Sequence, residues 1–149
     1  KTMGFIESAH AQGARLVCGG GRPSDPALAK GWFVEATVFA DVTPSMRLFQ
    51  EEVFGPVLAV IPWDDEDELL RQVNALEYGL TASIWTGDLA RAHRLAARVE
   101  SGYVWINHAS SHLLGAEFGG YKRSGLGREE GLSELLAWTQ TKNIYVSLG

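Results

Sequence analysis

Cysteine is almost absent from this sequence, since Cys18 is the only one among 149 residues. A single cysteine excludes an intrachain disulfide and suits a reducing compartment, so we expect the cytoplasm. The first residues, KTMGFIESAH, have no apolar stretch of the kind found in a secretory signal peptide. They have helical character from the start and begin without an initiator Met, so we expect the chain to be a piece of a longer protein.

Long apolar runs and an excess of basic residues are also missing. The uninterrupted apolar runs span a handful of residues, whereas a membrane helix needs about 20. The net charge of −5 gives no reason to expect nucleic acid, whose phosphates select a basic face. With 46% hydrophobic and 21% charged residues, the composition is that of one compact globular domain. We therefore expect neither a membrane nor a nucleic-acid partner.

The periodicity of apolar residues predicts an α/β fold. Between residues 57 and 106, strand-like and helix-like segments alternate as β-α-β-α-β, which predicts parallel strands joined by helical crossovers. Glycine-rich loops are expected at 19–31 and 107–127. We expect helices at 2–12, 43–49, 64–75, 88–100 and 127–138, and strands at 14–18, 32–42, 57–63, 81–86, 103–106 and 143–148.

Three features suggest chemistry but have simpler interpretations. Cys18 ends a predicted strand with no histidine nearby, which favours a small apolar role over a nucleophile. His108 and His112 stand four residues apart with Glu117 beyond them, but a zinc motif has a glutamate directly after its first histidine. In residues 119–127, Leu126 stands at the position where a phosphate loop has its lysine. No G-x-G-x-x-G links a strand to a helix. We expect no metal site and no complete dinucleotide fingerprint.

A pair of acids, Glu51 and Glu52, precedes the apolar run at 57–61. Adjacent residues on extended backbone point to opposite sides, so at most one of the two faces a given cleft. A carboxylate can accept hydrogen bonds from both hydroxyls of a ribose, with Phe54 packed beside the sugar or base. A solvated acidic loop is the other interpretation, and the residues alone leave both open.

Several sequence blocks together resemble the last third of the aldehyde dehydrogenase superfamily. In chain order they are QEEVFGPV, NALEYGL, GYVWIN and FGGYKRSG, followed by GRE. The resemblance extends over essentially the whole chain. It implies an incomplete parallel-sheet catalytic domain at residues 1–142, followed by an oligomerisation strand at 143–149. It also implies that the intact enzyme is a homodimer or homotetramer.

The same resemblance implies a reaction. Members of this superfamily oxidise an aldehyde to a carboxylic acid with NAD or NADP, through a thioester on a cysteine. Their nucleophilic cysteine and general-base glutamate lie upstream of the matched region, and Cys18 does not match that nucleophile. We therefore expect this chain to contain no catalytic residue and to be inactive alone.

Two residues are implied to bind the cofactor. Glu52 matches the family glutamate that accepts the hydroxyls of the nicotinamide ribose. Phe54 matches the phenylalanine that packs against the nicotinamide end. Glu51 is expected to be structural.

The loop after residue 107 resembles the wall of the substrate tunnel. The matched lining positions are Ser110, His112 and Phe118, and Glu129 matches a glutamate of an inner proton path in some members. Glu117 stands where the family usually has proline. This more polar wall suggests a polar or cationic aldehyde.

Two alternatives stay open. In the first, the chain is a non-catalytic interaction or oligomerisation module derived from the same fold. Such a module would use its terminal strand for association. A related oxidoreductase that acts on semialdehydes or acyl-CoA thioesters would carry the same sequence blocks.

Overall fold

The computed structural model describes all 149 residues, Lys1–Gly149. The chain divides into two compact units, Lys1–Leu69 and Leu70–Gly149. Each unit contains both helices and strands, which confirms the predicted α/β class. None of the helices combines the length and the apolar character that crossing a membrane requires.

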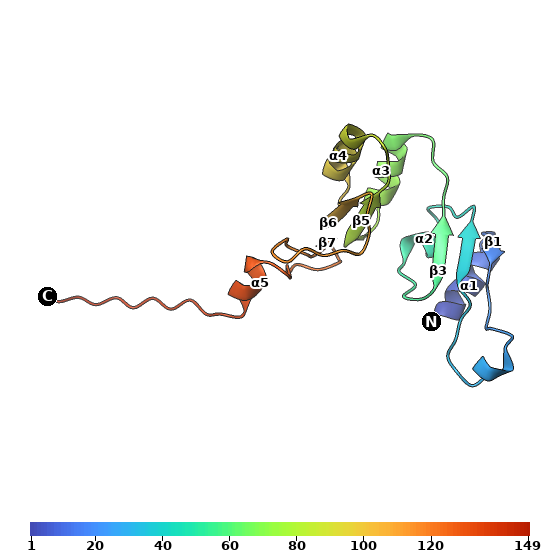
Figure 1. Ribbon diagram of the computed structural model, residues 1–149, viewed down its shortest axis with the longest axis horizontal. Coiled ribbons are helices and arrows are strands. Elements are labelled where there is room, and N and C mark those ends of the chain that lie inside the picture. Colours follow the sequence, from blue (N-terminus) through green and yellow to red (C-terminus); the bar gives the residue numbers. More distant parts are fainter. The chain divides into compact units, whose positions relative to one another are not determined.

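The first unit is built on a three-stranded sheet with the order β1-β2-β3 (Figure 1). β1 (Arg15–Cys18) runs antiparallel to β2 (Thr37–Ala40), and β2 runs parallel to β3 (Val57–Val60). Two helices, α1 (Thr2–Ala11) and α2 (Arg47–Gln50), accompany this sheet. The long glycine-rich loop between β1 and β2 contains a single short 3-10 turn, as its composition predicts.

Apolar side chains of α1 and the central strand form the core of the first unit. Phe5 and Phe39 are fully buried, and Ile6 and Ala9 are buried beside them. The helical residues recur at the spacing of one helix face, which is why α1 packs with that face inward. The guanidinium of Arg47 lies 3.9 Å from the centroid of the Phe5 ring, which fixes the start of α2 on α1. This contact positions the acidic link that follows α2.

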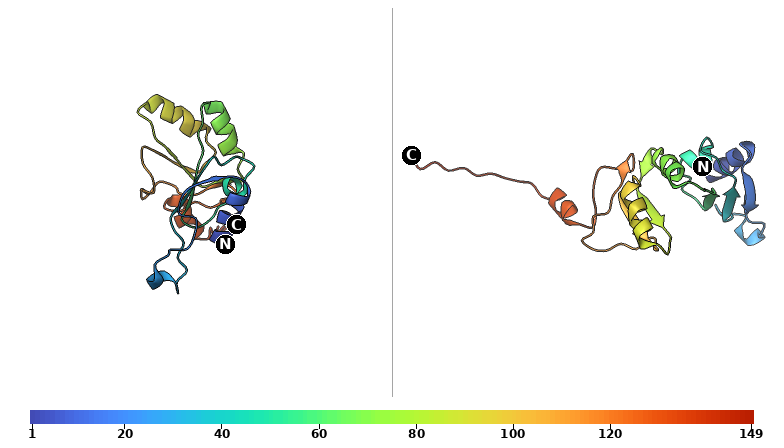
Figure 2. Two further views of the ribbon diagram at one scale, coloured as in Figure 1. Left: turned by 90° about the vertical axis from the view of Figure 1, so that its right-hand side faces the viewer. Right: turned by 90° about the horizontal axis from the view of Figure 1, so that it is seen from above.

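The predicted β-α-β-α-β alternation over residues 57–106 is found only in part: its last two strands form a β-α-β crossover in the second unit, whereas β3 belongs to the sheet of the first unit. β5 (Thr81–Ile84) and β6 (Tyr103–Ile106) pair in parallel, and α4 (Leu89–Arg98) connects them (Figures 1 and 2). A second ladder pairs β4 (Tyr78–Gly79) with β7 (Tyr121–Lys122) in antiparallel fashion. The short ladder brings the FGGYK block next to the start of the crossover.

The crossover helix begins at the predicted cap. The Oδ1 atom of Asp88 accepts a hydrogen bond of 2.9 Å from the backbone N–H of Arg91, which satisfies one free donor of the first turn. At the other end, the helix stops at Arg98 and not at the predicted residue 100. Extended backbone at Val99 ends it before Gly102 is reached.

One asparagine ties the ends of two helices together. α3 (Glu66–Asn74) ends at Asn74, whose Nδ2 donates to the carbonyl of Arg98 at 2.9 Å. The Oδ1 of the same side chain accepts from the N–H of Glu100 at 2.9 Å. Lys122 then donates to the Asn74 carbonyl at 2.5 Å and pairs with the Glu100 carboxylate at 2.6 Å. A lysine at this place satisfies carbonyls that a helix end leaves without partners.

Several predicted elements are shorter than expected, most of all the strand at 32–42 and the helix at 127–138. The strand predicted at 32–42 is paired only over Thr37–Ala40, because the parallel ladder starts where Thr37 meets Val57. The helix predicted at 127–138 is α5, Leu132–Ala137. It starts late because Glu129 is paired with Phe118 in a β-bridge, so its backbone is extended.

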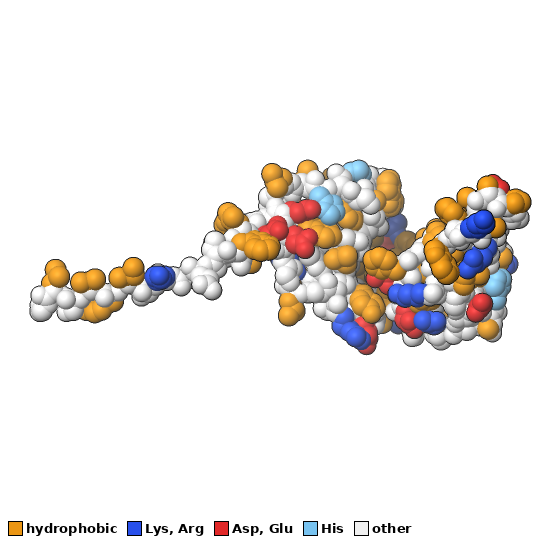
Figure 3. All heavy atoms as spheres, turned by 90° about the horizontal axis from the view of Figure 1, so that it is seen from below, with side chains coloured by type: hydrophobic (Ala, Val, Ile, Leu, Met, Phe, Trp, Pro, Cys, Tyr) orange, Lys and Arg blue, Asp and Glu red, His pale blue; other side chains and the backbone are white.

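The terminal strand predicted at 143–148 is not formed within the single chain. Residues 140–149 contain no helix or strand and continue as an extended segment (Figures 1 and 2). A strand needs a neighbour to accept its backbone hydrogen bonds, and this chain provides none there. The apolar side chains of the segment are exposed along it (Figure 3), with Ile144 77% and Leu148 96% exposed.

Candidate functional site

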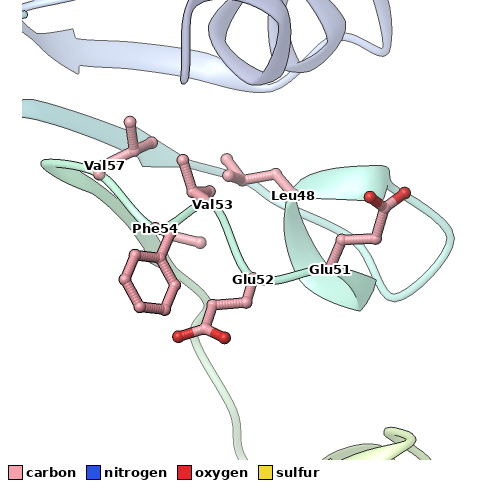
Figure 4. Close-up of a pocket in the computed structure, with 8 residues that line it drawn as sticks. Leu48, Glu51, Glu52, Val53, Phe54 and Val57 are labelled. Carbon is pink, nitrogen blue, oxygen red and sulfur yellow. The ribbon is translucent and has the colours of Figure 1, made fainter. Parts of the chain in front are cut away.

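The link between α2 and β3 forms one wall of an open hollow of about 460 Å³ in the first unit (Figure 4). α2 ends at Gln50 and β3 starts at Val57, so both acids of the link lie between two fixed elements. Both predicted cofactor residues, Glu52 and Phe54, contribute to this wall. The structure therefore brings them to one place.

The first acid of the link is held by an arginine one helical turn earlier. Arg47 donates from Nε to Glu51 Oε1 at 3.0 Å and from Nη2 to Oε2 at 3.2 Å. This bidentate hydrogen bonding lowers the pKa of Glu51 and raises that of Arg47. Glu51 is thus engaged with its own helix.

The second acid has no partner. Glu52 makes no hydrogen bond or ion pair within the chain. Its side chain projects from the same side of the link as Phe54, whereas Val53 points to the other side (Figure 4). Val53 is 8% exposed and Phe54 is 82% exposed. The link therefore turns Val53 toward the interior and leaves Phe54 exposed.

The backbone of Phe54 helps to aim its ring. Its φ of 55° lies in the left-handed region, which is unusual for a residue with a side chain. The next residue, Gly55, approaches α1 so closely that a Cβ there would lie 2.6 Å from Thr2 Oγ1. A side chain at position 55 would therefore have to displace the Thr2 side chain. An unpaired carboxylate next to an aromatic ring fits a group that carries two hydroxyls and a flat ring.

A second hollow, of about 540 Å³, lies in the second unit, and Phe118 and Glu129 are both among its lining residues. These two residues exchange backbone hydrogen bonds, Phe118 N–H to Glu129 O at 2.9 Å and Glu129 N–H to Phe118 O at 2.7 Å. Arg128 Nη1 donates to the carbonyls of Gly120 at 3.0 Å and Gly127 at 2.8 Å. The predicted tunnel residue and the predicted proton-path residue are thus neighbours.

The other two predicted tunnel residues differ in their placement. The ring of His112 lies 4.4 Å from that of Phe118, centroid to centroid, and its Nδ1 lies 2.7 Å from Glu130 Oε1. Ser110 stands in an exposed turn with a φ of 59°, and its hydroxyl makes no hydrogen bond. The structure brings His112 and Phe118 together and leaves Ser110 apart.

Two glutamates lie near this group: Glu117, which is expected from the sequence to lie in a more polar tunnel wall, and Glu130, which sequence reasoning missed as a site residue. Glu117 Oε1 accepts from the N–H of Ser133 at 3.1 Å, in the first turn of α5. Its carboxyl lies over Gly131, where a Cβ would come within 2.5 Å of it. The second, Glu130, holds His112. Each glutamate and its partner are 16 or 18 residues apart in sequence across an irregular loop, so no periodic pattern predicts these contacts.

The lone cysteine differs from its predicted setting. Cys18 is exposed, and its thiol donates a weak hydrogen bond to the Ala36 carbonyl at 3.8 Å. The interpretation as a small buried apolar side chain is therefore wrong in this chain. No base contacts the thiol. No group of three or more His, Cys, Asp or Glu side chains is arranged to hold a metal ion.

Comparisons with known proteins agree on one family. The family model described as "Aldehyde dehydrogenase family" matches residues 1–144. Aldehyde dehydrogenase tropH of Talaromyces stipitatus is 49% identical over all of this chain, which spans 30% of that protein. A betaine aldehyde dehydrogenase of Brucella anthropi is 44% identical over all of the chain, which spans 31% of it.

Solved structures agree with the sequence relatives. An NAD⁺ complex of an aldehyde dehydrogenase from Bacillus cereus matches 99% of this chain with a TM-score of 0.90 at 39% identity. A Mycobacterium tuberculosis aldehyde dehydrogenase complexed with NAD⁺ matches 99% of it with a TM-score of 0.89 at 42% identity. The chain spans 29% and 30% of those two structures. Given the match of the family model over nearly its whole length, the chain belongs to the aldehyde dehydrogenase family.

Proposed function

We propose that this chain is the part of an NAD- or NADP-dependent aldehyde dehydrogenase that contributes a cofactor wall and a substrate-tunnel wall. The whole enzyme oxidises a small aldehyde to a carboxylic acid in the cytoplasm. Family membership and the NAD⁺ complexes of similar structures support this proposal. The reacting cysteine and the general base belong to the part of the fold outside this chain.

The unpaired carboxylate of Glu52 is the observation that carries the proposal. Its two oxygens are free to accept hydrogen bonds from both hydroxyls of the nicotinamide ribose. Phe54 projects from the same side and packs against the flat end of the cofactor (Figure 4). The bound NAD or NADP supplies the acceptor for the hydride that leaves the aldehyde carbon. Glu51 takes no part, because Arg47 holds it.

The second unit provides the wall past which the aldehyde enters. His112 and Phe118 form an aromatic surface that excludes water and contacts the side chain of the aldehyde. Ser110, in the same loop, lines the outer end of the tunnel. Glu129, paired with Phe118 through the backbone, stands where a carboxyl can pass a proton between the hollow and solvent.

The extended terminus serves association. Residues 143–149 add a strand to the sheet of a neighbouring subunit, which gives a homodimer or homotetramer. The alternating apolar side chains and the unpaired backbone of this segment support that role. The same strand is the feature that would serve a purely structural module of this fold.

Turnover by the full-length enzyme that contains this chain tests the proposal. The purified enzyme is offered acetaldehyde, benzaldehyde and betaine aldehyde, each with NAD or NADP, and both the reduced cofactor and the acid are quantified. Equal amounts of acid and reduced cofactor are expected for at least one pair. Absence of turnover with every pair would refute the oxidoreductase assignment.

A further inference from the structure

Glu130, in the segment before α5, contacts the loop that carries the proposed tunnel residues at two points. The carbonyl of Glu130 accepts from the N–H of Gly115 at 2.7 Å, and its Oε1 lies 2.7 Å from His112 Nδ1. Both contacts reach into the loop from a position 15 or more residues away in sequence. Glu130 therefore contacts the loop through both its backbone carbonyl and its side-chain carboxylate.

Glu130 is itself held in an unusual conformation. Its φ of 64° lies in the left-handed region. Such a conformation persists for a non-glycine residue only where its surroundings fix it. Its N–H donates to Glu134 Oε2 at 2.7 Å, in the first turn of α5. The side chain is 31% exposed, but Oε2 is buried without a partner. An unpaired buried oxygen is costly, which is a further sign that this carboxylate is kept for its contact with His112.

The histidine that Glu130 holds is the centre of a group of rings. The centroid of His112 lies 4.4 Å from Phe118, 5.7 Å from Tyr103 and 6.0 Å from Trp105. The rings of Tyr103 and Trp105 lie at 26° and 30° to it, close to parallel. Because β6 fixes these two rings, the orientation of the imidazole decides the surface that it and Phe118 present together.

We infer that Glu130 is a positioning residue that orients His112 on Phe118 and thereby determines which aldehydes the tunnel wall accepts. The inference rests on the proposed function. Aldehydes with an aromatic ring contact this surface and depend on its orientation. Short aliphatic aldehydes do not reach it. Glu130 contacts neither the reacting carbon nor the cofactor, so it acts through substrate binding.

The test compares variants of the full-length enzyme with benzaldehyde and acetaldehyde. Glu130→Ala should raise KM for benzaldehyde about tenfold, which is the effect of losing one charge-assisted hydrogen bond. Its KM for acetaldehyde and both kcat values should stay within about twofold. Glu130→Gln should restore most of the benzaldehyde KM, because an amide oxygen can still meet Nδ1. Glu7→Ala, an exposed glutamate of α1, is the matched control.

Unchanged benzaldehyde KM in Glu130→Ala, or an equal rise for both aldehydes, would overturn the inference. The proposed function fails only if the wild-type enzyme turns over no aldehyde of the full panel; if it oxidises neither benzaldehyde nor acetaldehyde, crystal structures decide the positioning role. A displaced His112 ring in Glu130→Ala would support it. A His112 ring that stays on Phe118 in that variant would refute it.

Discussion

Gly102→Ala adds one methyl group and tests whether close backbone packing at Gly102 positions the proposed tunnel wall. It precedes β6, and a Cβ built there would lie 1.8 Å from the carbonyl oxygen of Gly119 and 2.8 Å from its carbonyl carbon. Both are backbone atoms, which cannot move aside as the end of a side chain can. Its φ lies outside the left-handed region, so the cost of Gly102→Ala is steric.

The size of the effect follows from these distances. Real Cβ contacts below 3.0 Å essentially never occur, so the Gly119 oxygen must retreat by at least 3.0 − 1.8 = 1.2 Å. Overpacking of this kind costs about 1–3 kcal/mol and therefore lowers Tm. Because Gly119 follows Phe118, the tunnel ring shifts with it. A displacement near 1 Å can cost about 100-fold in rate, so kcat/KM should fall about 10- to 100-fold.

The assay measures Tm and aldehyde kcat/KM for Gly102→Ala in the full-length enzyme. Gly87→Ala is the matched control, because no atom lies within 4 Å of its added Cβ and its φ is ordinary. The control should match the wild type in both quantities. A Gly102→Ala enzyme with wild-type Tm and wild-type kcat/KM would refute the close approach of these two backbone segments.

Three further predictions concern stability and assembly. Phe39→Ala removes a fully buried ring and should lower the free energy of unfolding by about 3–5 kcal/mol. Leu126→Ala, at a residue 98% exposed, should change it by less than about 0.5 kcal/mol. Chemical denaturation measures both. Hydrogen bonding to Arg47 lowers the pKa of Glu51, so this pair stabilises the fold above the carboxyl's ordinary pKa, and the contribution is lost as pH falls through the lowered value. Glu51→Gln should remove that pH dependence from unfolding curves, and a curve unchanged by the substitution would contradict the pairing. Deletion of residues 143–149 should dissociate the enzyme in sedimentation experiments, and an intact oligomer after deletion would contradict the strand-exchange role.

The sequence predicted the elements whose determinants are local. The helices predicted at 2–12 and 88–100 are set by residues within one or two helical turns, and the structure contains them as α1 and α4. The parallel pairing of β5 with β6 followed from the helix between them. The expectation that at most one of Glu51 and Glu52 faces a given cleft agrees with the structure, in which Arg47 holds Glu51 and Glu52 is unpaired.

What the sequence could not predict depends on partners distant along the chain or outside it. Glu117 and Glu130 meet groups across an irregular loop, and no spacing rule relates them. The start of α5 depends on the bridge between Phe118 and Glu129. The terminal segment 143–148 has the alternation of a strand, but its backbone donors and acceptors have no neighbour in this chain.

Cofactor binding by two neighbouring glutamate variants tests the central claim most directly. Glu52→Gln and Glu51→Gln are made in the full-length enzyme, and the dissociation constants for NAD and NADP are measured by calorimetry. Loss of charge-assisted hydrogen bonds to the ribose should weaken binding by Glu52→Gln about 10- to 100-fold. Glu51→Gln should bind within about twofold of the wild type, because Arg47 occupies that carboxylate. Equal affinities for the wild type and both variants would show that Glu52 does not hold the cofactor.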